Sequence, residues 1–510
     1  MKRRVLLLSL LLNMCFAKVT LAQNTQQQLD SFFSIIDKNG DISGSVLVTE
    51  KGKILYQKSF GYADIEHKVP NTENTLFQIA SVSKLFTAIA VLQLDEQKKL
   101  NLTNKFAKYF PHFPYAEVTI KQILSNTSGV PDVGAVFRPF FRLNHDTSLT
   151  LNDVIPALKV DKLTLNFNAG EHWEYSNTNY ILLALLVEKV SGEKFGNYLS
   201  KNIFKPAGMK NTFQKASGTN PYTHLNVAYN YASPFRFSLV PVRVDSFAIN
   251  DFIFHYKTLP SEGDANIYTS IADLANFDRA LNTGLLLKRN TPFAPSTRNN
   301  GKKVELHGVG SEIGEVGDFY WGYGNRISLD STRGKIVWES GGMPGCTANV
   351  ISNLTKHQLI IWLNNNESAS AMNNIFGALD IINNKPATVK KGKEHVAQIY
   401  GQQLVQYGYD YAFARLIENK SDTINYVLDL NEFNELGYEF SEKNMDTLAL
   451  ATFRTAILLS PDDDNLFNSY GEVLAKSGKK KEAIMMYKKS LLLNPKNEDS
   501  KNALEKLEKN

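Results

Sequence analysis

Residues 78–94 read QIASVSKLFTAIAVLQL, a nearly continuous apolar run with a lysine at its head. From residue 85 onward only two polar side chains interrupt the run, so the pattern predicts a helix that is buried on almost all sides. Lysine is rarely fully buried unless its charge has a partner. Ser81 lies three residues before Lys84, a spacing that places two side chains on one face of a helix. The stretch therefore raises the question of what this lysine pairs with.

Serine and lysine in this arrangement are suited to nucleophilic catalysis. A nucleophilic hydroxyl needs an amine to accept its proton, and partial burial lowers the pKa of a lysine and makes it a better base. The first N–H groups of a helix have no internal partner and can face developing negative charge on a substrate. The alternative is structural: a serine that caps the helix and a lysine that extends toward solvent. The motif alone is weak, because it recurs at Ser191–Lys194 and Ser477–Lys480.

Two further motifs supply context downstream. Tyr175-Ser176-Asn177 precedes another apolar helical pattern, and KIVWESGGMPGC at 335–346 reads as a strand that enters a glycine pair. A second Tyr-x-Asn, at 323–325, lies in a strand-like run, and we interpret it as part of a sheet.

With these motifs, the chain resembles the serine β-lactamase and penicillin-binding-protein superfamily. It looks closest to the branch that contains class C β-lactamases, D-alanyl-D-alanine carboxypeptidases, D-aminopeptidases and related esterases. The resemblance covers about residues 28–385 and extends to the blocks IKQILSNTSGVPD, FKPAGMKNT and YTSIADLANF. It implies an α+β fold in which an antiparallel sheet is flanked by helices and carries a helical insertion.

The resemblance also implies catalytic roles. Ser81 would be the nucleophile that accepts the acyl group, and Lys84 would assist its deprotonation. Tyr175 would pass a proton to the leaving group, with its phenolate favoured by the lysine charge. Asn177 would bind the substrate and position the lysine. The N–H groups of Ser81 and Gly342 would form the oxyanion hole. The ordinary alternative is that these side chains only cap or enter helices.

The third motif departs from the family pattern. Relatives carry Lys or His two residues before a glycine, whereas this chain has Glu339, followed by Ser340 and Gly341, and we expect these three residues to contact the substrate. Glu339 has three possible consequences: it pairs with Lys84 and weakens it as a base, it favours amine-bearing or uncharged substrates, or the site is inactive. A glycine pair usual in the family is also replaced, by Asp264-Ala265-Asn266-Ile267.

The first 22 residues have the pattern of a secretory signal peptide. Three basic residues precede a short apolar run that ends in small residues, so we expect an exported protein, periplasmic or extracellular, with no membrane span after cleavage. The segment holds four basic residues and no acids, so its removal lowers the net charge from +5 to +1. That charge argues against a nucleic-acid partner. Cys346 is then the single cysteine, which we interpret as a small buried side chain, and the scattered histidines predict neither a metal site nor a cofactor.

The rest of the chain divides by composition. We assign residues 23–385 to the hydrolase-like domain, 386–429 to a linker with a helical region, and 430–510 to tetratricopeptide repeats with a capping helix. The repeat assignment depends on a 34-residue period: Gly437 matches Gly471, and Phe453 matches Tyr487. Such repeats bind a peptide or helix in a groove or mediate self-association.

Two functional hypotheses follow. The first is an exported serine hydrolase that cleaves a small ester, amide or D-residue peptide through an acyl-serine intermediate. Hydrolysis of β-lactams is a weaker form of it, because Glu339 would repel the carboxylate of such a drug. The second is a catalytically weak or inactive hydrolase fold that acts as a binding protein through its repeats.

Overall fold

A computed structural model describes residues 24–137, 149–160, 162–246, 259–288 and 319–509. The predicted signal peptide lies outside these ranges. The described chain forms two compact units. The larger unit comprises the described residues of 1–232 and 243–391, and the helical unit comprises those of 233–242 and 392–510.

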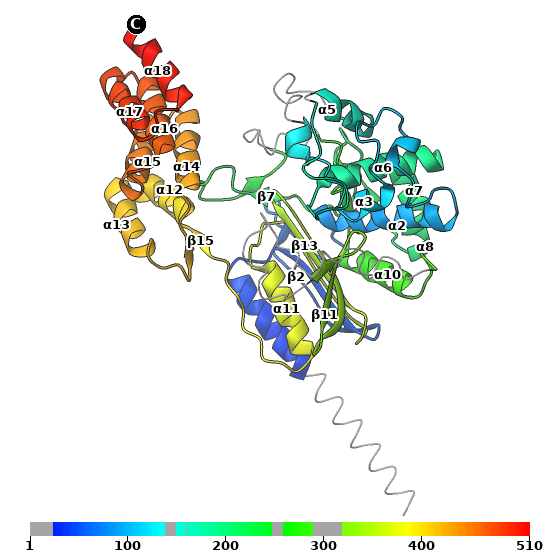
Figure 1. The fold of residues 1–510 in the computed structure, drawn as a ribbon. Coiled ribbons are helices and arrows are strands. Elements are labelled where there is room, and N and C mark those ends of the chain that lie inside the picture. Colours follow the sequence, from blue (N-terminus) through cyan, green and yellow to red (C-terminus); the bar gives the residue numbers. More distant parts are fainter. Residues whose placement is uncertain (1–23, 138–148, 161, 247–258, 289–318, 510) are drawn as a thin grey trace, which may run out of the picture. The chain divides into compact units, whose positions relative to one another are not determined.

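The larger unit is built on a seven-stranded antiparallel sheet (Figure 1). Its strands, in spatial order, are β10 (Phe319–Trp321), β11 (Arg326–Asp330), β12 (Gly334–Met343), β13 (Cys346–Asn353), β14 (Gln358–Asn364), β1 (Gly44–Glu50) and β2 (Lys53–Phe60). All seven residues of β14 are buried, as expected for a central strand with both faces covered. The α+β architecture predicted from the sequence is confirmed.

Two hydrophobic cores cover the two faces of this sheet. On one face, α11 (Ala371–Ile382) packs beside the helix at residues 24–38, and Trp338 and Trp362 belong to this core. On the other face lies the larger core, which includes α2 (Ser83–Glu96) and α6 (Asn177–Ser191). Residues 83–94 of α2 are all buried, in agreement with the helix predicted from QIASVSKLFTAIAVLQL.

Shorter elements complete the larger unit. Its other helices include η1 (Ala80–Val82), η2 (Phe106–Lys108), α3 (Ile120–Leu124), η3 (Leu151–Asp153), α5 (Val154–Val160), α7 (Phe195–Leu199), η4 (Ser200–Phe204), α8 (Lys205–Ala207), η5 (Pro221–Thr223) and α10 (Ile271–Asn282). Its minor strands are β3 (Tyr62–Asp64), β4 (Val69–Pro70), β5 (Phe77–Gln78), β6 (Phe213–Gln214), β7 (Tyr231–Ala232), β8 (Val242–Arg243) and β9 (Ile267–Thr269).

The second Tyr-x-Asn, at 323–325, is a turn between β10 and β11 rather than a strand, so our interpretation as sheet was wrong. Gly324 has φ +77° and lies close to α2: a Cβ added there would come within 2.7 Å of the Lys84 carbonyl oxygen. The positive φ and the close approach both favour glycine at this position. A backbone with this φ is not extended, so it interrupts the strand pairing between β10 and β11.

The helical unit consists of helices joined by short connections. They are α12 (Val396–Tyr407), α13 (Tyr409–Asn419), α14 (Leu430–Glu442), α15 (Asp446–Leu459), α16 (Asp464–Lys476), α17 (Lys480–Leu493) and α18 (Glu498–Lys509), with a short strand pair of β15 (Glu394–His395) and β16 (Tyr426–Val427). The starts of α14 and α16, at Leu430 and Asp464, are 34 residues apart.

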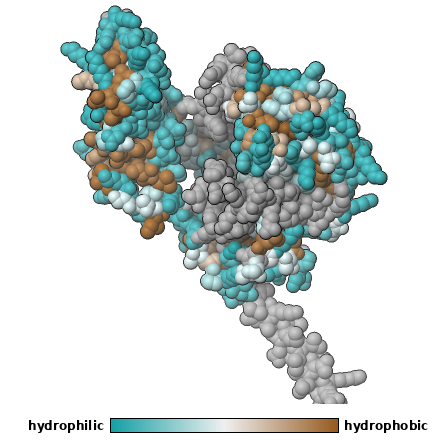
Figure 2. All heavy atoms as spheres, in the orientation of Figure 1, coloured by the Kyte–Doolittle hydropathy of each residue, from teal (hydrophilic) through white to brown (hydrophobic). Residues whose placement is uncertain are grey.

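Close crossings recur at the same period within this unit. A Cβ on Gly437 would meet the Phe453 ring at 2.5 Å, and one on Gly471 would meet the Tyr487 ring at 2.9 Å. The two helical pairs therefore cross in the same way, with glycine against an aromatic ring. Their classification as tetratricopeptide repeats remains a prediction. Figure 2 shows hydrophobic side chains gathered on the surface of these helices, where exposed residues include Leu458 and Leu492.

None of the helices in the described ranges is both long enough and apolar enough to cross a membrane.

Candidate active site

Ser81 lies in the short helix η1, immediately before α2 begins. The preceding residue, Ala80, has φ +43°, a conformation that is costly for a residue with a side chain. Strand β12 approaches this bend closely. A Cβ added to Gly341 would lie only 2.7 Å from the Ser81 nitrogen and still closer to the Ile79 carbonyl oxygen, so there is no room for a side chain at that position. The backbone therefore holds the predicted nucleophile at a tight junction between helix and sheet, and Gly342 follows on the same strand.

Lys84 is completely buried in the first turn of α2. Its Nζ donates hydrogen bonds to Ser81 Oγ and to the Asp264 carbonyl oxygen, both at 3.0 Å. It also lies 5.0 Å from the centre of the Tyr175 ring. Burial lowers the pKa of Lys84, while the carboxylates of Asp264 and Glu339 oppose that effect. The lysine thus has the partner that the sequence called for, in a setting that favours the neutral amine.

Tyr175 approaches the same hydroxyl from a different part of the chain. Its Oη donates a hydrogen bond to Ser81 Oγ at 2.9 Å, and its ring packs edge-on against Trp321 with centroids 5.6 Å apart. Burial, with the nearby Glu339 carboxylate, raises the pKa of Tyr175 well above its ordinary value. The phenolate expected from the family resemblance is therefore disfavoured, and the phenol is the resting form.

Asn177 begins α6, and its contacts differ from those expected. Its side-chain Nδ2 donates to Asp132 Oδ2 at 3.2 Å, and its backbone N–H donates to Asp132 Oδ1 at 2.6 Å. Asp132 also accepts the N–H of Thr178 at 3.3 Å, so its carboxylate satisfies the free N–H groups at the start of the helix. The amide is thus directed at Asp132 instead of Lys84, which corrects the predicted positioning role. Asp132 is the aspartate of the SGVPD block, which the sequence reasoning had treated only as part of the resemblance.

Glu339 forms a buried ion pair with Arg326. Arg326 Nη1 lies 2.6 Å from Glu339 Oε1, and the two side chains are 5% and 2% exposed. The guanidinium also lies 5.1 Å from the Trp321 ring and 4.9 Å from the Trp338 ring. Burial raises the pKa of Glu339, and Arg326 is the largest opposing influence. The ion-pair partner of Glu339 is thus an arginine from the neighbouring strand rather than Lys84, which was one of the three possibilities left open by the sequence. Sequence reasoning missed Arg326, although it directly follows the Tyr-x-Asn turn.

The other two residues of the third motif lie on opposite faces of β12. Gly341 shares the face of Glu339, whereas Ser340 is paired with Asn349 of β13 and is directed to the other face, because successive side chains of a strand alternate. Ser340 therefore does not join Ser81 and Lys84. Cys346 is buried on the neighbouring strand, and burial raises the pKa of its thiol to about 12, which agrees with a structural side chain.

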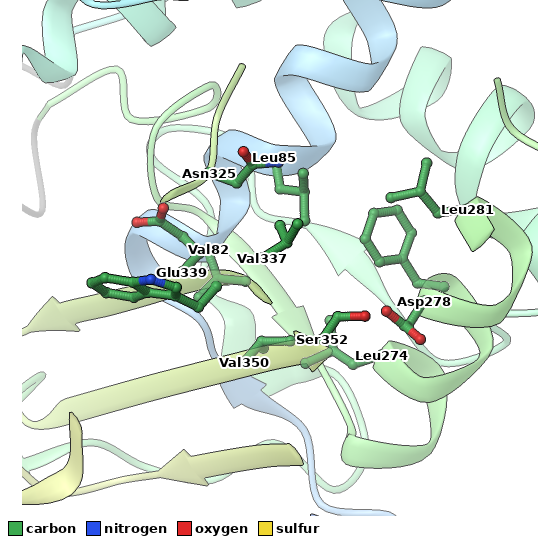
Figure 3. A pocket seen from close by; sticks show the side chains of 12 residues that line it. Val82, Leu85, Leu274, Asp278, Leu281, Asn325, Val337, Glu339, Val350 and Ser352 are labelled. Atoms are coloured by element: carbon green, nitrogen blue, oxygen red, sulfur yellow. The ribbon is translucent and has the colours of Figure 1, made fainter. Parts of the chain in front are cut away.

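A mostly apolar pocket lies between α2, α10 and the sheet (Figure 3). Asn325 and Glu339 are at one end of it, and Asp278 and Ser352 are at the other. Burial raises the pKa of Asp278 to about 6. Within the described ranges, no group of three or more His, Cys, Asp or Glu side chains converges in a way that could hold a metal ion.

Comparison with known proteins agrees with this geometry. The family model described as "Beta-lactamase" matches residues 24–379. Penicillin-binding protein 4* of Bacillus subtilis (strain 168) is 31% identical over 383 residues, which cover 72% of this chain and 80% of that protein. A penicillin-binding protein of Bacillus halodurans has a crystal structure that matches with a TM-score of 0.56 and 25% identity, covering 69% of this chain and 98% of that one.

A class C beta-lactamase structure has the same fold, with a TM-score of 0.54 at 18% identity, covering 72% of this chain and 97% of that one. The matched residues span both hydrophobic cores of the larger unit, and all of them except residues 233–242 belong to that unit. The family match thus falls almost entirely in the larger unit, and the chain belongs to the beta-lactamase family, within the superfamily of serine hydrolases that includes the penicillin-binding proteins.

Proposed function

We propose that this protein is an exported serine hydrolase that cleaves a small ester, amide or D-residue peptide through an acyl-Ser81 intermediate. The observation that carries the proposal is the convergence of two proton-bearing groups on one hydroxyl: Lys84 Nζ at 3.0 Å and Tyr175 Oη at 2.9 Å from Ser81 Oγ. A serine that only capped a helix would need neither group.

Acylation begins with the lysine. As a neutral amine, Lys84 accepts the Ser81 proton while Oγ forms a bond to the carbonyl carbon of the substrate. The carbonyl oxygen becomes an oxyanion, which the backbone N–H groups of Ser81 and Gly342 stabilise. The lowered pKa of Lys84 supports this role, because a lysine with its ordinary pKa would be protonated at neutral pH.

Departure of the leaving group requires a proton, which Tyr175 supplies. Its raised pKa keeps the phenol protonated, so Oη–H donates to the alkoxide or amine as the bond to the carbonyl carbon breaks. The proton now held by Lys84 replaces the one that Tyr175 has given. Water then attacks acyl-Ser81 and loses a proton to the same pair of groups. These groups return a proton to Ser81 Oγ as its bond to the acyl carbon breaks and the acid is released.

The ion pair of Arg326 and Glu339 bears on the choice of substrate. Because the Arg326 guanidinium compensates the Glu339 charge, the reversed charge in the third motif is compatible with the proposed activity. Both side chains are almost fully buried and the Arg326 guanidinium is paired with Glu339, so this pair does not present a positive charge to a substrate carboxylate. This arrangement favours substrates without a carboxylate at that position, and it supports esters and amides over β-lactams.

Export is proposed from the signal-peptide pattern of the first 22 residues. For the helical unit, the 34-residue period supports tetratricopeptide-type repeats that bind a protein or peptide. The alternative function, an inactive hydrolase fold that acts only as a binding protein, makes the opposite prediction in the following experiment.

The test is a fluorophosphonate probe followed by intact-mass measurement of the mature protein. The probe forms a bond to a nucleophilic Oγ and releases fluoride, so the wild type should gain one adduct and Ser81→Ala should gain none. Ser477→Ala is the matched control, because it removes a serine of another Ser-x-x-Lys and should label like the wild type. A folded wild type without an adduct, or an equal adduct on Ser81→Ala, would refute the proposal and favour the binding protein.

A further inference from the structure

Residues 233–242, here called the strap, run from the end of β7 to Val242, the first residue of β8, yet pack with the helical unit. The chain before the strap, up to Ala232, and the chain after it, from Arg243, belong to the larger unit. The strap is therefore a part of the catalytic half of the sequence that the C-terminal helices bind. No sequence pattern marked it, apart from the aromatic residues at 235 and 237.

Arg236 makes the polar contacts of the strap. Its guanidinium pairs with Glu435 and with Glu439, the latter through Nη1 and Oε1 at 2.5 Å, and its backbone N–H donates to Glu439 Oε2 at 2.8 Å. Both glutamates lie on α14, one turn apart. Side-chain exposure is 30% for Arg236 and 12% for Glu439, so this charge pair is partly shielded from solvent.

Phe237 makes the apolar contacts. Its ring stacks on Phe440 of α14 with centroids 4.5 Å apart, and it packs against the core of the helical unit. On α12, a Cβ added to Gly401 would lie 3.3 Å from Phe237 Cβ, and Gln402 Nε2 donates to the Ser238 carbonyl oxygen at 2.9 Å. Helices α12 and α14 thus form a face that holds an arginine and an adjacent phenylalanine in separate positions.

The chain that leads into the strap is tied to the active site by side-chain contacts within the larger unit. Asn230 Nδ2 donates to Gln78 Oε1 at 2.8 Å, and Gln78 Nε2 donates to Met343 Sδ at 3.2 Å. Gln78 lies three residues before Ser81, and Met343 follows Gly342. One hydrogen-bonded series therefore reaches both backbone segments of the proposed oxyanion hole.

The turn between β12 and β13 also contacts the base of the strap, by which we mean the flanking residues Asn230, Tyr231 and Val244. A Cβ added to Gly345 would lie 2.7 Å from the Tyr231 nitrogen and 2.8 Å from a Val244 methyl group. The Val244 N–H donates to the Asn230 carbonyl oxygen at 2.9 Å, which joins the two ends of the strap. Such close backbone packing transmits small displacements because it leaves no free space.

We propose that the α12–α14 face is a binding site for the strap of the same chain, and that its occupancy controls the geometry around Gly342. With the strap bound, the β7–β8 base is held against the β12–β13 turn, and the oxyanion hole is ordered. When the strap detaches, the base and the turn loosen together. The consequence for the acylation rate rests on the function proposed above, whereas the coupling itself does not.

The test is hydrogen exchange measured by mass spectrometry on the complete mature protein. The variant Glu435→Gln/Glu439→Gln keeps the size of both side chains and removes both charges that hold Arg236. The matched control is Glu442→Gln, an exposed glutamate on the same helix. Amides in α16 and α17 serve as the internal check that the helical unit stays folded. Arg236→Gln is a second variant that breaks the same contacts from the other side.

We expect amides of residues 233–242 to exchange roughly 5–30-fold faster in the double variant and in Arg236→Gln, but not in the control. The amides of Met343, Gly345 and Cys346 should also exchange faster in the same two variants. Unchanged exchange at 233–242 would overturn the binding site, and faster exchange there without any change at 343–346 would overturn the coupling. Protection of the strap that disappears on dilution would show that a second copy supplies it, which would overturn binding within one chain. These readouts need no activity, so a wild type that fails to label leaves them intact.

Discussion

Replacing Arg326 by methionine tests whether the guanidinium sets the charge state of the site. Methionine retains most of the apolar stem of arginine and removes the charge, so Glu339 is left buried with no cation within bonding distance. The pair is close, at 2.6 Å, and the two side chains are 5% and 2% exposed, so solvent screens it little. Breaking a buried pair of this kind costs about 3–5 kcal/mol, mainly because one charge is left uncompensated.

The double variant Arg326→Met/Glu339→Gln separates that cost from the loss of packing. It replaces both charges by neutral groups, a change that is often close to neutral for stability. We therefore expect Arg326→Met to lower the free energy of unfolding by about 3–5 kcal/mol, and the double variant to recover at least about 2 kcal/mol of it. Glu339→Gln alone completes the cycle.

Urea unfolding followed by tryptophan fluorescence is the assay. All four tryptophans, at 173, 321, 338 and 362, lie in the larger unit, so the signal reports that unit alone. If the effects of the two single variants add to within about 0.5 kcal/mol, the two side chains are not coupled and the reasoning fails.

The same variants make a prediction about pH. Arg326 lowers the pKa of Lys84, so its removal, together with the stranded Glu339 carboxylate, raises that pKa. The pH profile of the acylation rate should then move to higher pH in Arg326→Met and return toward the wild-type position in the double variant. A profile that moves to lower pH would contradict this account.

Three further predictions concern the site. Burial raises the pKa of Asp264 from 3.8 to about 6, so the folded state loses stability as the pH rises through about 6. Asp264→Asn should therefore be more stable than the wild type at pH 8, by up to about 3 kcal/mol, and about equally stable at pH 4. A difference in thermal unfolding that does not depend on pH would contradict this prediction. Tyr175→Phe should slow amide turnover about 10²–10⁴-fold but slow fluorophosphonate labelling far less, because fluoride leaves without a proton; equal losses would exclude the proton-donor role. Gly341→Ala should reduce turnover about 10²–10³-fold by displacing the oxyanion strand from Ser81, whereas Gly134→Ala, which adds a methyl group in open space, should not; full activity in the first variant would contradict the close approach.

The parts of the site that are close in sequence were predictable. Ser81 and Lys84 are three residues apart, so helical geometry alone brings them together, and a buried lysine in an apolar helix signals a partner. The antiparallel sheet was predictable for a similar reason, since apolar runs such as QLIIWLN report burial directly.

The polar partners were not predictable, because they depend on long-range register. Arg326 meets Glu339 only because β11 and β12 pair with Arg326 opposite Trp338. Asp132 meets Asn177 across 45 residues of sequence. Charge and hydrophobic periodicity carry no information about which strand lies beside which. The phenolate was mispredicted because the resemblance supplied a role for Tyr175 without its degree of burial, which decides its pKa.

The strap also bears on how this protein can be divided for experiments. A truncated chain that ends at Lys391 looks like a natural catalytic fragment, yet it would keep residues 233–242 and lose the helices that cover them. Phe237 would then be exposed beside an unpaired Arg236, a combination that promotes aggregation. Because β7 and β8 already pair with each other, a short turn from Ala232 to Val242 can replace residues 233–241 of the strap. Soluble production of the larger unit on its own should therefore require two changes to the gene: truncation after Lys391 and replacement of the strap by a short turn.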